Sequence, residues 1–231
     1  MSSFSRRREG AIGLSVYLVY LVVRRLVVHD RGRRIAERNA RAIVAFERRL
    51  GIHVEPSVQR MMIPHRHTMA VANLSYITLN VGLTVGWLWI LFTRRDPRYH
   101  ALRRAWMIAT LSAQPIYVLR PTAPPRGVEG FTDTLREAGM DIDSGFVSQL
   151  YNPIAAMPSI HVAYAWVIGA GMADTARSRL VRRLAPAYAP VIALVVIATG
   201  NHFVTDVAAG AALGAASLRA GGHRRGRRRP R

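Results

Sequence analysis

Three titratable side chains lie inside long apolar stretches of the sequence: His161, His202 and Asp206. Ionisable groups are costly in apolar segments, so they are functional candidates by default. His202 and Asp206 are four residues apart and would share one face of a helix, where the carboxylate would fix the imidazole tautomer and stabilise its cation. The commoner explanation for such a pair taken alone is a structural polar contact between packed helices.

Groups suited to phosphate stand near these residues in the sequence. Arg120 and Arg126 flank a proline-stiffened segment, and guanidinium groups match phosphate oxygens in bidentate geometry. Pro158 is favoured at the start of a helix, and the first N–H groups of that helix, from Ser159 and Ile160, would suit an anion. The alternative is that the two arginines only anchor a loop to lipid headgroups.

Other chemistries fit these residues less well. Ser159 and His161 are two apart and would point in different directions on a helix, which argues against a serine nucleophile. Two histidines and one carboxylate match a facial metal triad, but the nearby arginines would repel a cation. We therefore predict no metal and no cofactor at these residues.

The composition narrows the class of protein. The chain has 231 residues, half of them apolar, with 33 basic and 13 acidic side chains and a formal net charge of +20. All the basic side chains are arginine and cysteine is absent, which excludes lysine-based chemistry, disulfides and zinc–cysteine sites. Nucleic-acid-binding domains are also basic but do not carry several long apolar runs. The charge therefore points to an anionic membrane surface rather than to nucleic acid.

Long apolar runs predict membrane-spanning helices. Residues 68–92 contain no acidic or basic side chain, and about 20 helical residues cross a bilayer core. Further runs cover residues 105–119, 153–172, 186–199 and 203–218. We expect an all-α integral-membrane bundle of six transmembrane helices, or of five if residues 11–28 do not span. Arg24 and Arg25 interrupt that first run, which resembles a signal peptide, but no cleavage signal follows it.

The distribution of arginine predicts the orientation in the membrane. Arginines gather in residues 94–104, in residues 177–183 and in the tail, and we expect these on the cytoplasmic side with both termini. Residues 120–152 carry more acids than arginines, and both histidine-bearing helices would begin on their side. All-arginine usage is typical of a high-GC bacterium. We therefore expect a bacterial plasma-membrane protein with an extracytoplasmic site.

The chain divides into four expected segments. They are an N-terminal anchor (1–30), an amphipathic interfacial segment (31–67), a catalytic membrane bundle (68–218) and a basic cytoplasmic tail (219–231). Within the second segment, helical spacing relates Ile35, Asn39, Ala42, Ile43, Phe46 and Leu50. That pattern predicts a helix on the membrane surface, whose arginines would bind anionic lipids. The alternative is a solvated basic linker, and arginine in the tail is expected only to fix topology.

Three motifs carry a resemblance to a known family: Ala123-Pro-Pro-Arg126, Ala156-Met-Pro-Ser-Ile-His161 and Gly200-Asn-His202-Phe-Val-Thr-Asp206. Their order and spacing resemble the type 2 phosphatidic acid phosphatase superfamily. The match also takes in Glu47-Arg-Arg-Leu-Gly-Ile52, Glu55, Gln59 and Asp133-Thr134. The phosphatase branch has a lysine where this chain has Ala113, and Ser-Arg where it has Val195-Val196. For that reason the sequence looks closest to the inositol phosphorylceramide synthases.

The resemblance implies metal-free phosphoryl transfer through a phosphohistidine, from a lipid phosphate or a phospholipid headgroup. His202 would be the nucleophile, Asp206 would orient it, and His161 would protonate the leaving oxygen. The implied phosphate-binding groups are Arg126, Arg120, Ser159 and Ile160. These roles agree with the chemistry of imidazole and guanidinium groups.

Three other functions stay open on the sequence alone. A lipid phosphate or polyprenyl diphosphate phosphatase would use the same residues with water as the acceptor. A non-catalytic membrane protein would use its polar residues for helix packing, as the small-residue seam Gly210-x-x-x-Gly214 suggests. A proton-coupled transporter would use the histidines as a relay, but their place at helix starts favours chemistry near one surface. The motifs do not define an oligomeric state.

Overall fold

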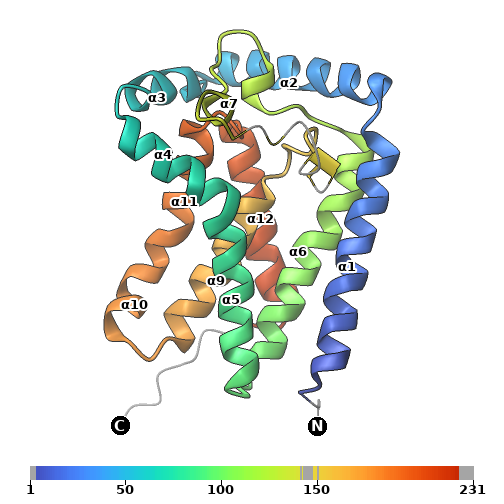
Figure 1. Cartoon of the computed structure of the whole chain (residues 1–231), viewed down its shortest axis with the longest axis vertical. Coiled ribbons are helices and arrows are strands. Elements are labelled where there is room, and N and C mark those ends of the chain that lie inside the picture. The colour runs from blue at the N-terminus through green and yellow to red at the C-terminus, as the bar shows by residue number, and fades with distance from the viewer. Residues whose placement is uncertain (1–3, 141, 143–147, 150, 224–231) are drawn as a thin grey trace.

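The computed structural model describes residues 4–140, 142, 148–149 and 151–223 (Figure 1). This part of the chain forms helices joined by loops, as the all-α prediction requires. Its elements are α1 (Arg6–Val27), α2 (Asp30–Leu50), α3 (Glu55–Met62), α4 (Arg66–Leu74), η1 (Ser75–Leu79), α5 (Asn80–Thr93), α6 (Tyr99–Leu119), η2 (Pro125–Gly127), α7 (Thr134–Glu137), α9 (Ile160–Thr175), α10 (Arg179–Leu184), η3 (Ala185–Ala187), α11 (Tyr188–Ala198) and α12 (Val204–Ala220). The arginines beyond residue 223, on which the tail prediction rests, lie outside the described residues.

Three helical stretches are long and apolar enough to cross a membrane, among the residues described. They are α1, the continuous run Arg66–Thr93 through α4, η1 and α5, and the run Arg179–Ala198 through α10, η3 and α11. Helix α6 carries Arg103 and Arg104, and α9 and α12 have 16 and 17 residues, fewer than the roughly 20 that span a bilayer core. The chain is thus a helical membrane protein, and the count of six spans stays a prediction.

Helix α9 packs against α12, α11, α6, α5 and α10. Its closest partner is α12, because the predicted small-residue seam removes side chains from their contact. A Cβ added at Gly210 would lie 2.3 Å from the Ser159 carbonyl oxygen, and one at Gly214 would lie 2.8 Å from the Ala163 carbonyl oxygen. The backbones of the two histidine-bearing helices therefore touch.

Helix α2 lies across one end of the bundle, roughly perpendicular to α1 (Figure 1). The interfacial segment is two helices rather than one, because Gly51 ends α2 with a positive φ of 69° and α3 follows at Glu55. The buried stripe of α2 consists of small residues and one acid: Gly32, Ala36, Ala40 and Glu47. On the predicted apolar face, Phe46 and Leu50 are 50% and 56% exposed, so the bundle does not cover them.

The apolar run predicted to begin a span at Pro153 starts as a loop. Helix α9 begins at Ile160, two residues after the predicted Pro158, and the Ser159 hydroxyl caps it by accepting from the Val162 N–H. The preceding loop pairs with the segment after α6, since the N–H of Thr122 donates to the Ile154 carbonyl and that of Ala156 donates to the Thr122 carbonyl. Prolines restrict this stretch to extended and turn conformations.

Arg24, which interrupts the first apolar run, ties α1 to that loop. Its Nε donates to the Tyr151 carbonyl at 2.7 Å, and its guanidinium also donates to the Ser148 carbonyl. The Tyr20 hydroxyl, one turn earlier on α1, accepts from the Asn152 N–H at 2.8 Å. The first helix is thereby fixed against the bundle at the end where the histidines lie.

Candidate active site

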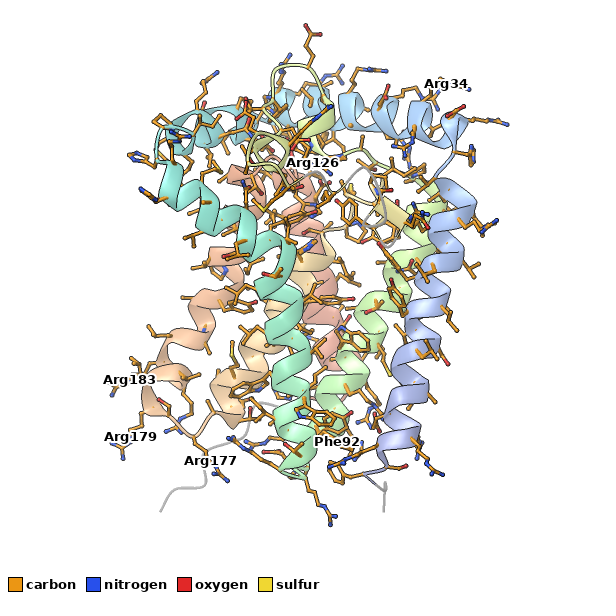
Figure 2. The ribbon with its side chains drawn as sticks, in the orientation of Figure 1. Arg34, Phe92, Arg126, Arg177, Arg179 and Arg183 are labelled. Atoms are coloured by element: carbon orange, nitrogen blue, oxygen red, sulfur yellow. The ribbon has the colours of Figure 1, made fainter. Side chains whose placement is uncertain are left out.

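The structure brings the two predicted histidines together at one end of the bundle. His161 lies in the first turn of α9, and His202 lies two residues before the first residue of α12. Their ring centroids are 5.7 Å apart. As the sequence predicts, both helices start from the same side, which is also the side of Arg126 and of α2 (Figure 2).

The immediate partner of His202 is a backbone carbonyl. Its Nδ1 lies 2.8 Å from the Ala156 oxygen and 3.6 Å from Asp206 Oδ2. Because a carbonyl only accepts hydrogen bonds, Nδ1 carries the proton and Nε2 keeps a lone pair. Nε2 is buried and has no hydrogen-bond partner among the described residues. The expectation that His202 and Asp206 share one helix face is wrong, because α12 begins at Val204 and His202 lies before it, but the two side chains are still close.

Asp206 acts on His202 through charge and through the local backbone. Its Oδ2 accepts from the Phe203 N–H at 2.9 Å, which fixes the residue next to His202 at the start of α12. The side chain is fully buried. Its carboxylate is close enough to stabilise positive charge on the imidazole.

His161 is held by aromatic and amide contacts. Its ring packs on Tyr76 with centroids 4.4 Å apart, and its carbonyl accepts from Asn80 Nδ2 at 2.9 Å. Tyr76 belongs to η1, a π-helical turn, and such turns occur frequently at functional sites. The Tyr76 hydroxyl lies 2.9 Å from that of Tyr151. The Nδ1 atom of His161 is buried without a hydrogen-bond partner in the described part of the chain.

The two predicted arginines differ in position. Arg126 is buried: its Nε donates to Asn201 Oδ1 at 2.9 Å and its Nη1 to Asp133 Oδ2 at 3.2 Å. Its own N–H donates to the Gly200 carbonyl, so it is fixed beside the segment that carries His202. Arg120 is exposed at the end of α6 and does not line the cavity described below.

The start of α9 presents part of the predicted anion site. The Ser159 N–H donates to the Asp206 carbonyl at 3.0 Å, and Ser159 is fully buried. The N–H groups of Ile160 and His161 come before the first backbone hydrogen bond of the helix, from Ala163 to Ser159. Ile160 also lines the cavity, so these two N–H groups are the better candidates for an anion.

A pair of glutamates holds the first N–H groups of α12. Glu55 Oε1 accepts from the Val204 N–H at 2.7 Å, and Glu47 Oε1 accepts from the N–H and the hydroxyl of Thr205 at 2.7 and 2.6 Å. Both glutamates are fully buried. Burial and the neighbouring Glu47 raise the pKa of Glu55 to about 7.

Gln59 lies beside Gly200, two residues before His202. Its amide exchanges two hydrogen bonds of 2.9 Å with the backbone of Thr132. Gly200 has a positive φ of 69°, and a Cβ there would lie 2.8 Å from Gln59 Nε2. Only glycine suits this position, because a side chain would be strained and would displace Gln59.

An apolar cavity of about 580 Å³ opens in front of the histidines. It extends from His161 and His202 along α5 and α6 to Val85 and Trp106. Tyrosines are frequent in its wall: Tyr17, Tyr20, Tyr76, Tyr117, Tyr151 and Tyr164. Helices α1 and α5, which belong to stretches long and apolar enough to cross a membrane, both line it.

Several site residues escape prediction from sequence alone. Asn201 stands next to His202 in the third motif, but its contact with Arg126 depends on a loop from another part of the chain. Tyr76 lies in an apolar run that predicts only a membrane span. Nothing in that run indicates that the Tyr76 ring packs on His161. The Ala156 carbonyl carries no side-chain signal at all.

A helical membrane protein with a histidine pair at the head of an apolar cavity is the class that this fold and site define. The chain matches the PAP2 superfamily over residues 41–220 and belongs to that superfamily. Searches of curated protein sequences and of solved structures give no match. Membership confirms the predicted superfamily and supports an enzyme that transfers or hydrolyses phosphate groups.

Proposed function

We propose that the protein transfers a phosphoryl group from a lipid phosphate or a phospholipid headgroup to an alcohol, through a phosphohistidine on His202. The observation that carries this proposal is the geometry of His202 at the head of the apolar cavity. Its Nδ1 is tied to the Ala156 carbonyl, which leaves Nε2 without a hydrogen-bond partner among the described residues, and its ring lies 5.7 Å from that of His161. A neutral imidazole oriented in this way is a competent nucleophile.

The proposed reaction has two balanced steps. In the first, His202 Nε2 attacks phosphorus, the bond from phosphorus to the leaving oxygen breaks, and protonated His161 gives that oxygen its proton. In the second, the acceptor hydroxyl gives its proton to His161 and attacks phosphorus, and the phosphorus–nitrogen bond breaks. The negative charge of the bound phosphate favours the protonated form of His161 that the first step needs.

Arg126 and the start of α9 are proposed to bind the phosphoryl oxygens. Arg126 is oriented by Asn201, which lines the cavity next to His202. The N–H groups of Ile160 and His161 supply a second set of donors, and a helix start of this kind favours anions. Together they would stabilise the charge that develops on the equatorial oxygens.

The cavity supports a lipid as the substrate. Its wall is apolar and aromatic over the depth from His161 to Trp106, and it is bordered by membrane-spanning stretches. A phosphate at the histidines would leave an attached hydrocarbon chain in this space. The absence of two cations of the phosphatase branch, at Ala113 and Val196, favours the inositol phosphorylceramide synthase-like branch, with water as the alternative acceptor.

We propose that the site faces the extracytoplasmic side of a bacterial plasma membrane. Arg177, Arg179 and Arg183 lie at the opposite end of the molecule from Arg126 (Figure 2). Arginine-rich ends of membrane proteins stay on the cytoplasmic side. The exposed arginines of α2 would then contact anionic headgroups of the outer leaflet.

The test compares the purified wild type with His202→Ala in detergent, with phosphatidic acid, mixed phospholipids and polyprenyl phosphates as donors. We expect wild-type turnover and trapping of an acid-labile, phosphate-labelled protein, and loss of both in His202→Ala. His67→Ala, an exposed histidine on α4, is the matched control and should keep both. Analysis of the products separates transfer to an alcohol from hydrolysis. Unchanged turnover in a folded His202→Ala protein would refute the proposed nucleophile.

A further inference from the structure

A second cluster of chemistry-bearing side chains lies behind the start of α12. Glu47 is in the last turn of α2, Glu55 is the first residue of α3, and His53 is in the turn between these helices. His53 Nδ1 is 3.5 Å from Glu47 Oε2 and 3.1 Å from Glu55 Oε2, and one ligand atom from each residue lies within 4.8 Å of the others. Both glutamates are fully buried, and the His53 side chain is 11% exposed.

In each of the two carboxylates only one oxygen accepts a hydrogen bond. Their Oε1 atoms accept the hydrogen bonds from Val204 and Thr205. Their Oε2 atoms, and His53 Nδ1, are buried without a hydrogen-bond partner among the described residues. Three ligand-type atoms thus face one another across a common centre, and each belongs to a side chain that the fold holds in place.

We propose that Glu47 Oε2, Glu55 Oε2 and His53 Nδ1 bind one divalent transition-metal ion, Zn²⁺ being the best fit. Carboxylate oxygen and imidazole nitrogen are both common ligands of zinc, at about 2.0–2.2 Å. Ligands at that distance from a tetrahedral ion lie about 3.4 Å apart, and the two separations from His53 Nδ1 agree with this edge. The site is separate from the proposed phosphotransfer, which uses His202 and His161.

Electrostatics favours a cation between these glutamates. Two carboxylates in a fully buried site repel each other, and a buried charge is tolerated when it is paired or binds a metal. The α12 N–H groups stabilise one oxygen of each carboxylate, whereas the Oε2 atoms lie near His53 Nδ1 but accept no hydrogen bond among the described residues. A dication would neutralise both. It would also fix the glutamates that hold the backbone of Val204 and Thr205, two and three residues after His202.

The exposed edge of His53 provides the route for exchange. Its ring packs edge-on against Phe131, with centroids 6.1 Å apart. The cluster lies at the end of the molecule that carries α2 and α3, away from the membrane-spanning part of α5 (Figure 1). An ion from the aqueous phase can therefore reach the cluster without crossing the apolar cavity.

The test measures metal content directly. Purified wild type in detergent is incubated with ZnCl₂ or MnCl₂, desalted and analysed by mass spectrometry for metals. We expect about one ion per chain, lost in His53→Ala and in Glu55→Gln, with zinc retained better than manganese. His67→Ala, Glu37→Gln, an exposed glutamate on α2, and His202→Ala should keep the ion. The last control excludes binding at the histidine pair.

A second readout guards against misfolded variants. Zinc should raise the thermal unfolding midpoint of the wild type and of Glu37→Gln, and should leave that of His53→Ala unchanged. A wild type that retains no metal after exposure, or a His53→Ala protein that retains as much as the wild type, would overturn the proposal. Because neither measurement uses substrate, failure of the phosphotransfer proposal would leave this result intact, and the reverse also holds.

Discussion

Asp206 and the Ala156 carbonyl act on His202 in different ways. The carbonyl holds the proton on Nδ1, whereas Asp206 lies 3.6 Å away and fixes Phe203. In Asp206→Asn the amide oxygen can still accept from Phe203, so the fold should survive while the charge is lost. We expect kcat to fall about 10²-fold, less than the ~10⁴-fold typical where the aspartate alone sets the tautomer. Steady-state kinetics measures this, and a 10⁴-fold loss would show that Ala156 does not hold the tautomer.

Arg126 and Arg120 offer a matched pair of arginines. Arg126 is buried and fixed next to Asn201, which lines the cavity, whereas Arg120 is exposed; neither arginine is itself part of the cavity wall. Loss of one donor to developing charge typically costs about 10²-fold or more in rate. We therefore expect kcat/KM to fall by that factor in Arg126→Ala and to change little in Arg120→Ala. Equal effects of the two substitutions would mean that Arg126 does not bind the phosphoryl group.

At the residue scale, the sequence predicts the groups that are costly to bury. His161, His202 and Asp206 stand out because they are ionisable side chains within apolar runs. One complete predicted span separates the runs that begin near the two histidines, so both histidines are expected on the same side of the membrane. The groups that contact these side chains cannot be recognised from the sequence in the same way. Asn201, Tyr76 and the Ala156 carbonyl are ordinary groups whose role comes only from contacts between distant segments.

The contact between α9 and α12 sets the spacing of the two histidines. In Gly210→Ala the new Cβ would meet the Ser159 carbonyl oxygen at 2.3 Å, and backbone atoms cannot rotate away. We expect the free energy of unfolding to fall by about 1–3 kcal/mol, as for other overpacked sites, with a loss of activity. Thermal unfolding with an activity assay measures both effects.

The control for this element is Gly82→Ala on α5. A Cβ at Gly82 meets nothing within 4 Å, so alanine should leave stability unchanged or raise it slightly through its higher helix propensity. If Gly210→Ala behaves like Gly82→Ala, the two helix backbones do not touch as described.

At the element scale, the presence of a helix is easier to predict than its first residue or its buried face. The apolar runs identify the long spans, because lipid-facing helices need side chains that are apolar all round. The start of α9 is harder, since the apolar residues from Pro153 belong to a loop that pairs with Thr122. The buried stripe of α2 is also missed, because small residues such as Ala36 and Ala40 carry little hydrophobic signal.

The orientation of the whole molecule is testable because the chain contains no cysteine. Single cysteines at Arg34 on α2 and Arg183 on α10 lie at opposite ends (Figure 2). With a membrane-impermeant maleimide on intact spheroplasts, we expect Arg34→Cys to be labelled at once and Arg183→Cys only after permeabilisation. Labelling of both from one side would contradict the proposed topology, and the cysteine-free wild type gives the background.

The acids at the start of α12 make this helix and α9, the two helices that begin at the histidine pair, electrically unequal. In α12 the N–H groups of Phe203, Val204 and Thr205 are all taken by carboxylates, so the positive end of its macrodipole is neutralised. At the start of α9, Ile160 and His161 line the cavity, so the positive end of that macrodipole lies beside it. In the proposed reaction α9 would therefore attract the phosphate while the neutralised start of α12 would leave the His202 imidazole electron-rich, so attraction and attack would not compete for the same dipole.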